Sequence, residues 1–522
     1  MTAHTYELPN AAQMQALIYQ QALNNAYTQA SSMGLSALER QLAAQYIGAR
    51  NGKVFATKIW HFATNTSSMG VRMLDSVGLE CTPATDTVAG RDDFAEESEI
   101  FTWQRCNYTR DSDGTARPTA LYGAPSYRTT GAVDIGNVYP TFFYAVQDCG
   151  TYDMYYMSDS PHPELGLVPW YEAVKADGTV LPFYVHSAFY SVNNTEGGNT
   201  ILRSQYGAPA YNQSYNGMIT AYQKKGTGYW GAGMERNLWA YLMLVIKYNT
   251  KNSQKIFAGC TSFTDQVACA LGETGVKRVL LSSQGGFYAG CCISVGSATN
   301  KDRGSTTIGD LADRVQITNI ETVTINSTQY VALNLNLSKT ITTTTATYVT
   351  SMPCYSGETD GVIGHFDGSI KSNTDGRHVF RIGGTEYSNG QSIIASNVVY
   401  YRDDVNAQWL QYVAMRGTKH VANAYTDYVL SGKVPALDSD YWIGDMAVNP
   451  STGSMNVKTT GTSDILGVGD RIWGPSSGKG TQGELREAYT IGALGSGSTV
   501  GLCFGNLGYA LGDAYWNFGA CD

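Results

Sequence analysis

The closing stretch TVGLCFGNLGYALGDAYWNFGACD, residues 499–522, decides how this sequence is interpreted. From Ala488 to the last residue the only formal charges are Asp513 and Asp522, and glycines alternate with aromatic and small residues. Chain ends are usually polar and frayed. This composition instead indicates a packed, sheet-like segment in which some positions fix the backbone and others carry an arbitrary assortment of side chains.

The whole chain has the composition of a β-rich, multidomain protein. Its 522 residues correspond to about three or four domains at the usual domain size. Only 15% of the residues are charged, whereas glycine (57) and tyrosine (36) are abundant. This balance is typical of β-rich extracellular or virion proteins with long loops, and it is atypical of helical cytosolic enzymes.

Charge and hydropathy exclude two classes of partner. The net charge is -9 and no cluster of lysine and arginine occurs, so no nucleic-acid surface is expected. The most apolar stretch, residues 238–246, has about half of the ~20 residues that a membrane span needs, so no membrane insertion is expected. The N-terminal residues lack the pattern of a secretory signal, and export by that route is not expected.

Changes of pattern along the chain predict an α+β, β-rich architecture. Residues 1–50 are predicted to form an N-terminal helical region for oligomerisation or virion attachment, with two helices that break near Gly34. Residues 51–215 are predicted to form a β-rich domain. A third domain is placed at 216–522, with its core helix near 232–257 and a small inserted β-domain at 270–350. The threonine-rich run 340–350 is predicted to be an exposed strand or linker.

No motif requires catalysis, a cofactor or a metal. WGPSSGKGT, residues 473–481, has neither the glycine spacing of a phosphate-binding loop nor the strand and helix of a nucleophile elbow. Asp111-x-Asp113-Gly114 is a fragment of a calcium loop and is predicted to be an ordinary turn. Ten scattered cysteines without a CxxC pair are predicted to be mostly buried free thiols. We therefore expect no catalytic residues and no metal ligands.

The segment IGALGSGSTVGLCFGNLGYALGDAYWNFGA, residues 491–520, resembles the variable region of proteins diversified by diversity-generating retroelements. These include phage receptor-binding proteins of the major tropism determinant type, which are built on a C-type lectin-like fold. Residues 235–254 are similar to the long helix that precedes the lectin-like region in such structural proteins. Residues 364–390 are similar to the segment after the inserted β-domain. The resemblance therefore covers roughly residues 230–522.

The resemblance divides the closing segment into two interleaved sets. The positions that match the scaffold pattern are Gly492, Gly497, Gly501, Leu502, Asn506, Leu507, Leu511, Trp516, Asn517 and Gly519. The positions that match variable, ligand-binding sites are Ala493, Gly495, Ser496, Thr499, Phe504, Gly508, Tyr509, Asp513 and Tyr515. Asn codons mutated only at adenines cannot yield Lys, Gln, Glu, Met or Trp, and residues 493–515 contain none of these. The ending Ala520-Cys521-Asp522 departs from the family, whose members often place a basic residue there, and it leaves Cys521 either buried or reactive.

The resemblance implies a virion receptor-binding protein of the tail or fibre, made in the host cytoplasm. Its implied partners are a host cell-surface receptor, either protein or glycan, other virion tail proteins, and copies of itself in a homotrimer. Displayed tyrosines give a large contact area at low entropic cost, and several weak sites gain avidity in an oligomer. Two alternatives stay open: a bacterial lectin-like ligand-binding protein outside any phage, and a tail enzyme that degrades cell-surface glycans.

Overall fold

The computed structural model describes residues 35–299, 307–418, 420, 425–435, 440–474 and 481–522. The first expected N-terminal helix and residues 475–480 of the glycine-rich loop lie outside these ranges. Strands hold 38% of the residues and helices 13%, so the fold is β-rich and built from several sheets, as the composition predicts. Among the described residues no helix is long and apolar enough to cross a bilayer.

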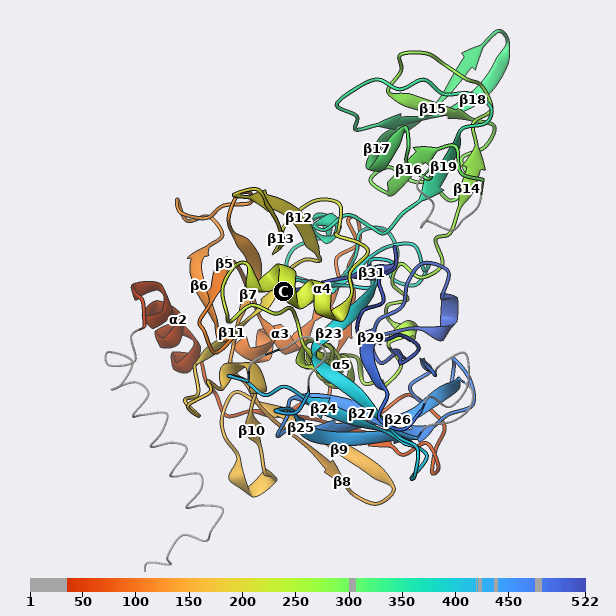
Figure 1. Cartoon of the computed structure of the whole chain (residues 1–522). Helices are drawn as coiled ribbons and strands as arrows, with labels where there is room; N and C mark the ends of the chain where they lie inside the picture. The colour runs from red at the N-terminus through yellow and green to blue at the C-terminus, as the bar shows by residue number, and fades with distance from the viewer. Residues whose placement is uncertain (1–34, 300–306, 419, 421–424, 436–439, 475–480) are drawn as a thin grey trace, which may run out of the picture.

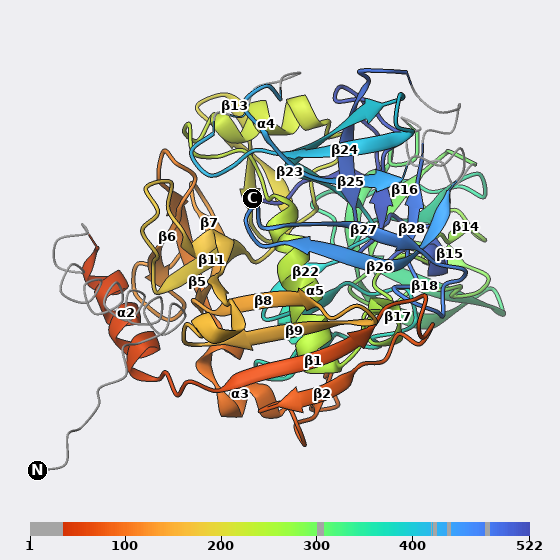
Figure 2. The same ribbon diagram turned by 90° about the horizontal axis from the view of Figure 1, so that it is seen from below.

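Two antiparallel sheets and a hairpin make up most of the first half of the described chain (Figures 1 and 2). The first sheet contains, in spatial order, β10 (Val168–Pro169), β8 (Phe143–Asp148), β9 (Tyr152–Ser158), β1 (Val54–Trp60) and β2 (Val71–Leu74). The second contains β11 (Phe183–Ser187), β7 (Asp134–Pro140), β5 (Gln104–Arg110) and β6 (Ala116–Leu121). The hairpin is β12 (Ser191–Glu196) with β13 (Asn199–Ser204), and a short pair joins β3 (Cys81–Thr82) to β4 (Arg91–Asp92). The short helix α3 (Asp93–Glu97) follows β4.

Helix α2 (Ala37–Gly48) lies at one edge of the molecule (Figure 1). Ser36 starts it with a capping box, in which the Ser36 hydroxyl accepts from Glu39 N–H and the Glu39 carboxylate accepts from Ser36 N–H. Glu39 also pairs with Arg117 of β6, which ties the helix to the second sheet. This element confirms the second of the two helices expected in the N-terminal region.

Helix α5 (Met234–Tyr248) is the core helix that the apolar run around residue 240 predicts. Every residue of the helix except Glu235 is buried, because strands contact it on several sides: β1, β9, β23 (Ser392–Asp403) and β27 (Ser454–Thr460). Figure 2 shows the helix passing through the middle of the molecule. It ends where Asn249 takes a left-handed conformation, with φ of 55°. The main hydrophobic cluster surrounds this helix and includes residues from Phe55 to Leu507.

A separate six-stranded sheet occupies the region where the inserted β-domain was expected, and it projects from the rest of the molecule (Figure 1). Its strands, in spatial order, are β14 (Gln266–Ala268), β19 (Tyr348–Ser351), β16 (Cys292–Gly296), β17 (Ala312–Ile325), β18 (Thr328–Leu335) and β15 (Arg278–Leu281). A bridge between Leu271 and Leu280 brings the two ends together, so the sheet is nearly closed into a barrel. It has its own hydrophobic cluster, which includes Val279, Ile293 and Leu333.

The largest sheet belongs to the last third of the chain and has nine strands. Their order is β25 (Val429–Pro435), β24 (Gln408–Val413), β23 (Ser392–Asp403), β29 (Leu485–Thr490), β30 (Gly505–Asn506), β28 (Arg471–Trp473), β26 (Tyr441–Asn449) and β27 (Ser454–Thr460), and β31 (Phe518–Gly519) pairs with β23. A small sheet of β20 (Gly368–Ser369), β21 (Phe380–Ile382) and β22 (Thr385–Tyr387) precedes it, and α4 (Tyr215–Gln223) packs against β23.

The packing in the structure differs from two expectations about the organisation of the chain. The run 340–350 was predicted to be exposed, but β19 lies between β14 and β16 and buries Val349 and Thr350 completely. Threonine has a high β propensity and packs well inside a sheet, so the polar composition of the run was a poor guide to its burial. Residues on both sides of the expected domain boundary at 215, such as Tyr184 and Leu238, share the main hydrophobic cluster. The domain boundaries themselves stay predictions.

Candidate binding surface

The closing segment is held on three sides by the rest of the chain. β30 lies between β29 and β28, and β31 pairs in parallel with β23. Leu502 N–H donates to Ser253 Oγ over 3.0 Å, and Cys503 N–H donates to Asp470 Oδ2 over 2.9 Å. Near the end, Cys521 C=O accepts from Ala232 N–H over 2.7 Å. The segment is therefore a fixed part of the fold.

At several of the expected scaffold positions the residue is a glycine, and neighbouring atoms lie too close for a Cβ to be added without a shift. A Cβ on Gly501 would lie 2.3 Å from Ser253 Oγ, and one on Gly519 would lie 2.6 Å from Gln391 Oε1. Such distances exclude any side chain unless the neighbour moves. The structure buries Gly501, Leu502, Leu507 and Gly519, and it leaves Gly497, Asn506, Trp516 and Asn517 half-buried.

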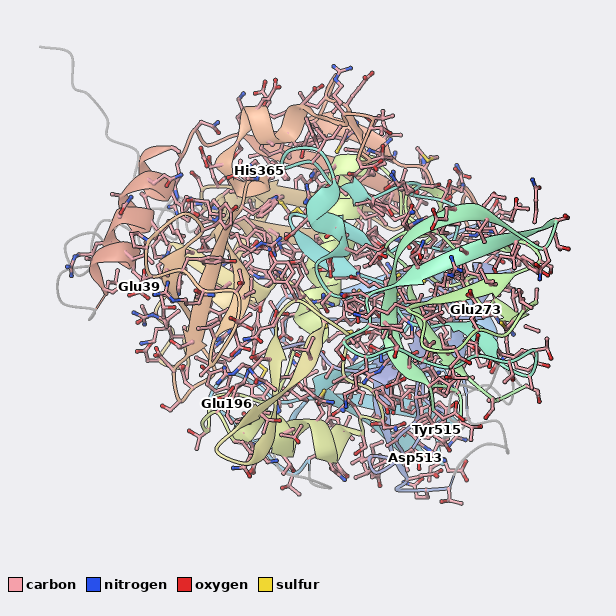
Figure 3. The ribbon with its side chains drawn as sticks, turned by 90° about the horizontal axis from the view of Figure 1, so that it is seen from above. Glu39, Glu196, Glu273, His365, Asp513 and Tyr515 are labelled. Carbon is pink, nitrogen blue, oxygen red and sulfur yellow. The ribbon has the colours of Figure 1, made fainter. Side chains whose placement is uncertain are left out.

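Three of the expected variable positions, Tyr509, Asp513 and Tyr515, lie close together in the structure. Figure 3 shows Asp513 and Tyr515 at one edge of the molecule. The rings of Tyr509 and Tyr515 lie with their centroids 5.3 Å apart, and Tyr515 is 48% exposed. Asp513 lies beside Tyr515 in the figure, and its carboxylate accepts from Ala510 N–H over 2.9 Å. Gly508 comes just before this group, and its carbonyl accepts from Arg486. The edge offers aromatic faces and a carboxylate to a ligand.

The other accessible variable positions lie on a different turn. Gly495 is exposed with φ of 86°, and its N–H donates to Thr261 C=O over 2.9 Å. Ser496 and Thr499 are half-buried, and the Thr499 hydroxyl donates to Ser496 C=O over 2.6 Å. A cleft of about 290 Å³ lies beside this turn and is lined by Gly497, Lys255, Asp375 and Asp464, among others.

Two of the expected variable positions do not belong to a binding surface. Ala493 and Phe504 are each only 5% exposed. Phe504 packs edge-on against Trp473, with ring centroids 6.4 Å apart, and it lines the interior between the sheet strands. Their assignment as ligand-binding residues is therefore corrected: both contribute to packing. A glycine-rich pattern does not reveal which small or aromatic residue faces inward.

We call the group of Tyr509, Asp513 and Tyr515 the tyrosine edge. It packs on residues that the sequence analysis did not identify as part of the site. Tyr489 and Phe518 lie beneath Tyr509, with ring centroids 5.4 and 4.8 Å from it. Glu487 is fully buried below them and accepts hydrogen bonds from Tyr489 Oη and from Tyr215 N–H. Burial raises the pKa of Glu487 to about 8, so this carboxyl keeps its proton at neutral pH. Only the tertiary structure brings Tyr215 of α4 to this position.

Two clusters of possible metal ligands are each occupied by a lysine. Cys81, Asp92 and Asp367 lie close together, and Lys247 Nζ is 2.8 Å from Asp92 and 2.6 Å from Asp367. His61, Asp148 and Asp153 form the other cluster, in which Lys458 Nζ is 3.0 Å from both carboxylates. An ammonium group already balances the charge at the place a cation would take.

The calcium-loop fragment is an ordinary turn, as expected. Asp113 Oδ1 accepts from Thr115 N–H over 3.0 Å, and Gly114 N–H donates to Asp111 C=O over 2.9 Å. These are the bonds of an Asp-Gly turn, and the Asp113 carboxylate is engaged by the backbone.

The cysteines are free in the structure, and eight of the ten are buried. Cys521 is one of them, and burial raises the pKa of its thiol to about 11, so it is buried and unreactive as a thiolate.

Two half-buried acids, Glu172 and Glu235, lie between the first half of the chain and α5. Glu172 pairs with His186, and Glu235 accepts from Asn397 Nδ2 over 2.7 Å. Burial, with the Glu172 charge adding to it, raises the pKa of Glu235 to about 7. Burial also opposes ionisation of Glu172, but His186 outweighs it and keeps the pKa of Glu172 below its ordinary value.

Comparison with known proteins assigns no family to this arrangement. No protein-family model matches the sequence, and no curated protein is significantly similar to it. The site is therefore interpreted from its own geometry.

Proposed function

We propose that this chain is a virion receptor-binding protein that recognises the bacterial host surface through a C-type lectin-like region formed by its last third. The observation that carries the proposal is the division of the closing segment. Exposed Tyr515, with Tyr509 and Asp513, stands on a frame that includes Gly501 and Gly519, where an added side chain would force Ser253, Asp470 or Gln391 to move. Substitutions at exposed positions usually cost within about 0.5 kcal/mol, so such a surface tolerates variation that its frame does not.

The exposed part of the surface has the chemistry of an adaptable recognition site. Tyr515 and the half-buried Tyr509 offer rigid aromatic area, and Asp513 offers a carboxylate. Antibody paratopes use the same combination of residue types. Self-association into a trimer would add avidity to individually weak contacts.

Removing the tyrosine edge is expected to abolish binding to cells and leave the fold intact. The double variant Tyr509→Ser and Tyr515→Ser should lower binding by tenfold or more, because two large contact faces are lost. The measurement applies fluorescent full-length protein to a panel of bacterial strains and counts labelled cells. Val405→Ser, at a residue that is 86% exposed, is the control and should bind as the original chain does. A panel without labelled cells, or one labelled equally by the double variant, contradicts the proposal.

Diversification makes a separate prediction about the gene. A near-identical copy of the DNA that encodes residues 491–520 should lie near a reverse transcriptase gene and differ from it mainly at adenines. Substitutions among sibling sequences should then concentrate at the accessible positions Gly495, Ser496, Thr499, Gly508, Tyr509, Asp513 and Tyr515. Substitutions spread evenly over the buried glycines as well would count against diversification, although receptor binding could still hold.

A further inference from the structure

A second groove lies away from the tyrosine edge. It has a volume of about 500 Å³, and its lining includes Trp103, Arg105, Tyr122, Tyr206, His365 and Arg381. These residues come from the start of β5 and the residue before it, the residue after β6, the second residue after β13, the loop before β20, and strand β21. In Figure 3 the label of His365 stands far from those of Asp513 and Tyr515. The proposed receptor surface therefore does not include this groove.

The floor of the groove carries an excess of positive charge. The side chain of Arg105 is 8% exposed and Arg381 is 2% exposed. Arg381 gives its N–H groups to backbone carbonyls, among them Thr359 over 2.9 Å and Gly364 over 2.6 Å, so no carboxylate is hydrogen-bonded to it. Asp360 is the single carboxylate among the lining residues, and it pairs with Arg105 Nη2 at 2.9 Å. Two buried guanidinium groups thus face one carboxylate.

One nitrogen of Arg105 lacks a partner. Among the described residues nothing accepts a hydrogen bond from Arg105 Nη1, although this atom is buried. A buried donor without an acceptor costs about 1–3 kcal/mol, and more when the group is charged. The Arg105 guanidinium also lies over the ring of Phe189, 4.6 Å from its centroid, and among the described residues Asp360 is the carboxylate that pairs with it.

The walls of the groove are aromatic. Tyr122 is 73% exposed and Tyr206 is 39% exposed, so both rings present faces to solvent. His365 stands edge-on to Trp103, with ring centroids 4.9 Å apart. Burial, together with the nearby Arg381 and Arg105 charges, lowers the pKa of His365, so its ring is neutral at pH 7. Neutral rings of this kind stack against the C–H face of a flat or cyclic ligand.

The negative charge of Asp360 limits which anionic ligand can bind beside Arg105. Its carboxylate accepts from Arg105 and from Tyr206 Oη, the latter over 2.5 Å. A phosphate dianion placed at Arg105 would be repelled by this neighbouring charge. A single carboxylate meets less repulsion, and hydroxyl groups on the same ligand can donate to the remaining lone pairs of Asp360.

We infer that this groove binds an acidic saccharide, with the sugar carboxylate on Arg105, a ring hydroxyl on Asp360 and the sugar ring against Tyr122. The volume lies within the range of small-ligand sites. The inference does not rest on the receptor-binding proposal, because none of the groove residues belongs to the closing segment. Uronic acids and sialic acids share this chemistry, and both occur as parts of larger glycans and as free sugars.

Calorimetric titration of the full chain tests this inference. Trigalacturonic acid and N-acetylneuraminic acid are titrated separately, with galactotriose as the neutral counterpart and inorganic phosphate as the simple anion. We expect at least one acidic sugar to bind tenfold or more tightly than galactotriose and phosphate. The sugar that binds more tightly identifies the class as uronic or sialic acid. Equal binding of the neutral sugar, stronger binding of phosphate, or no binding at all overturns the inference.

Two variants locate the binding. Arg105→Gln should weaken binding of the acidic sugar by tenfold or more and reduce the preference of the protein for that sugar over galactotriose. Tyr122→Ala removes a ring that is 73% exposed, so it keeps the fold even if Arg105→Gln does not, and it should weaken binding by about tenfold. Val405→Ser, at a residue that is 86% exposed and lies outside the groove lining, is the control and should leave the titration unchanged. Binding that Tyr122→Ala does not weaken would place the sugar elsewhere and contradict the inference.

Discussion

Replacing Lys247 with methionine is expected to lower the free energy of unfolding by about 3–5 kcal/mol. Lys247 lies in the last turn of α5, is 2% exposed and pairs with both Asp92 and Asp367. Methionine keeps the length of the side chain but leaves two buried carboxylates without a cation. Urea unfolding followed by tryptophan fluorescence measures the change.

The size of this effect follows from what the two carboxylates hold. Asp92 caps α3 through Ala95 N–H, and Asp367 accepts from Tyr248 Oη over 3.0 Å and from Gly383 N–H over 2.7 Å. Lys247 therefore joins α5 to α3 and to the segment before β21. Burial already raises the pKa of Asp92 in spite of Lys247, so losing the ammonium would protonate or expel this group.

A surface pair provides the matched control. Lys371→Met removes an ion pair with Asp86 in which the lysine side chain is 54% exposed. Exposed pairs contribute about 0–1 kcal/mol, so this variant should unfold close to the original chain. A loss at Lys247→Met no larger than at Lys371→Met would show that the buried network does not bear on stability.

Stability is expected to fall as the pH rises from about 6 to 8. Four carboxyl groups among the described residues have pKa values raised to about 7 or 8 in the folded chain: Glu235, Glu386 and Asp470 at about 7, and Glu487 at about 8. Burial is the main cause in each case. The unfolded chain gives up these protons above about pH 4.5, whereas the folded chain keeps them until about pH 7. Folding therefore takes up protons in this window, and stability is lost as the pH rises through it.

One buried histidine opposes this trend at lower pH. Burial lowers the pKa of His420 to about 4, so the unfolded chain gains a proton below about pH 6.5 that the folded chain does not. The two effects partly cancel between pH 4.5 and 6.5, and only the carboxyl effect is left above that. Each group contributes about 1.4 kcal/mol per pH unit over the range in which the folded chain keeps a proton that the unfolded chain has lost. Three groups that titrate near pH 7 and one near pH 8 therefore lower stability by about 6 kcal/mol in total between pH 6 and 8.

Glu487→Gln isolates one of these groups. The amide can donate to Tyr489 Oη and accept from Tyr215 N–H, so the neutral geometry is kept. In urea unfolding at pH 6, 7 and 8, the free energy of unfolding of this variant should fall less steeply with pH than that of the original chain. The difference in slope should be up to about 1.4 kcal/mol per pH unit. Glu321→Gln, at an exposed residue of β17, controls for the loss of a charge. An unchanged pH dependence in Glu487→Gln would mean that this carboxyl is ionised in the folded chain.

Local pattern was enough to predict several elements. The apolar run around Leu238 predicts a helix buried on most faces, and α5 is such a helix. Alternating valine, isoleucine and threonine predict β15, β17 and β18, and the low charge predicts a β-rich fold. These predictions succeed because helix and strand periodicity are properties of neighbouring residues.

Burial within an irregular segment was not predictable in the same way. Ala493 and Phe504 stand among exposed positions in the sequence, yet both are interior. The strand containing Val349 has a polar sequence but lies inside a sheet. Which way such residues face depends on the strands on either side, and the chain supplies those strands from distant positions.

The sequence by itself determined the periodic elements, and its resemblance to a known family predicts a division of residues 491–520 into scaffold and variable positions. Only the tertiary structure decided which residues support the closing segment from below, where Tyr215 N–H donates to Glu487. It also decided where positive charge exceeds negative charge, because Arg105 and Arg381 lie near one carboxylate, Asp360. The physical reason is the distance along the chain over which each effect acts. Propensity and periodicity act over a few residues, whereas desolvation and ion pairing depend on atoms that only the folded chain brings within a few ångströms.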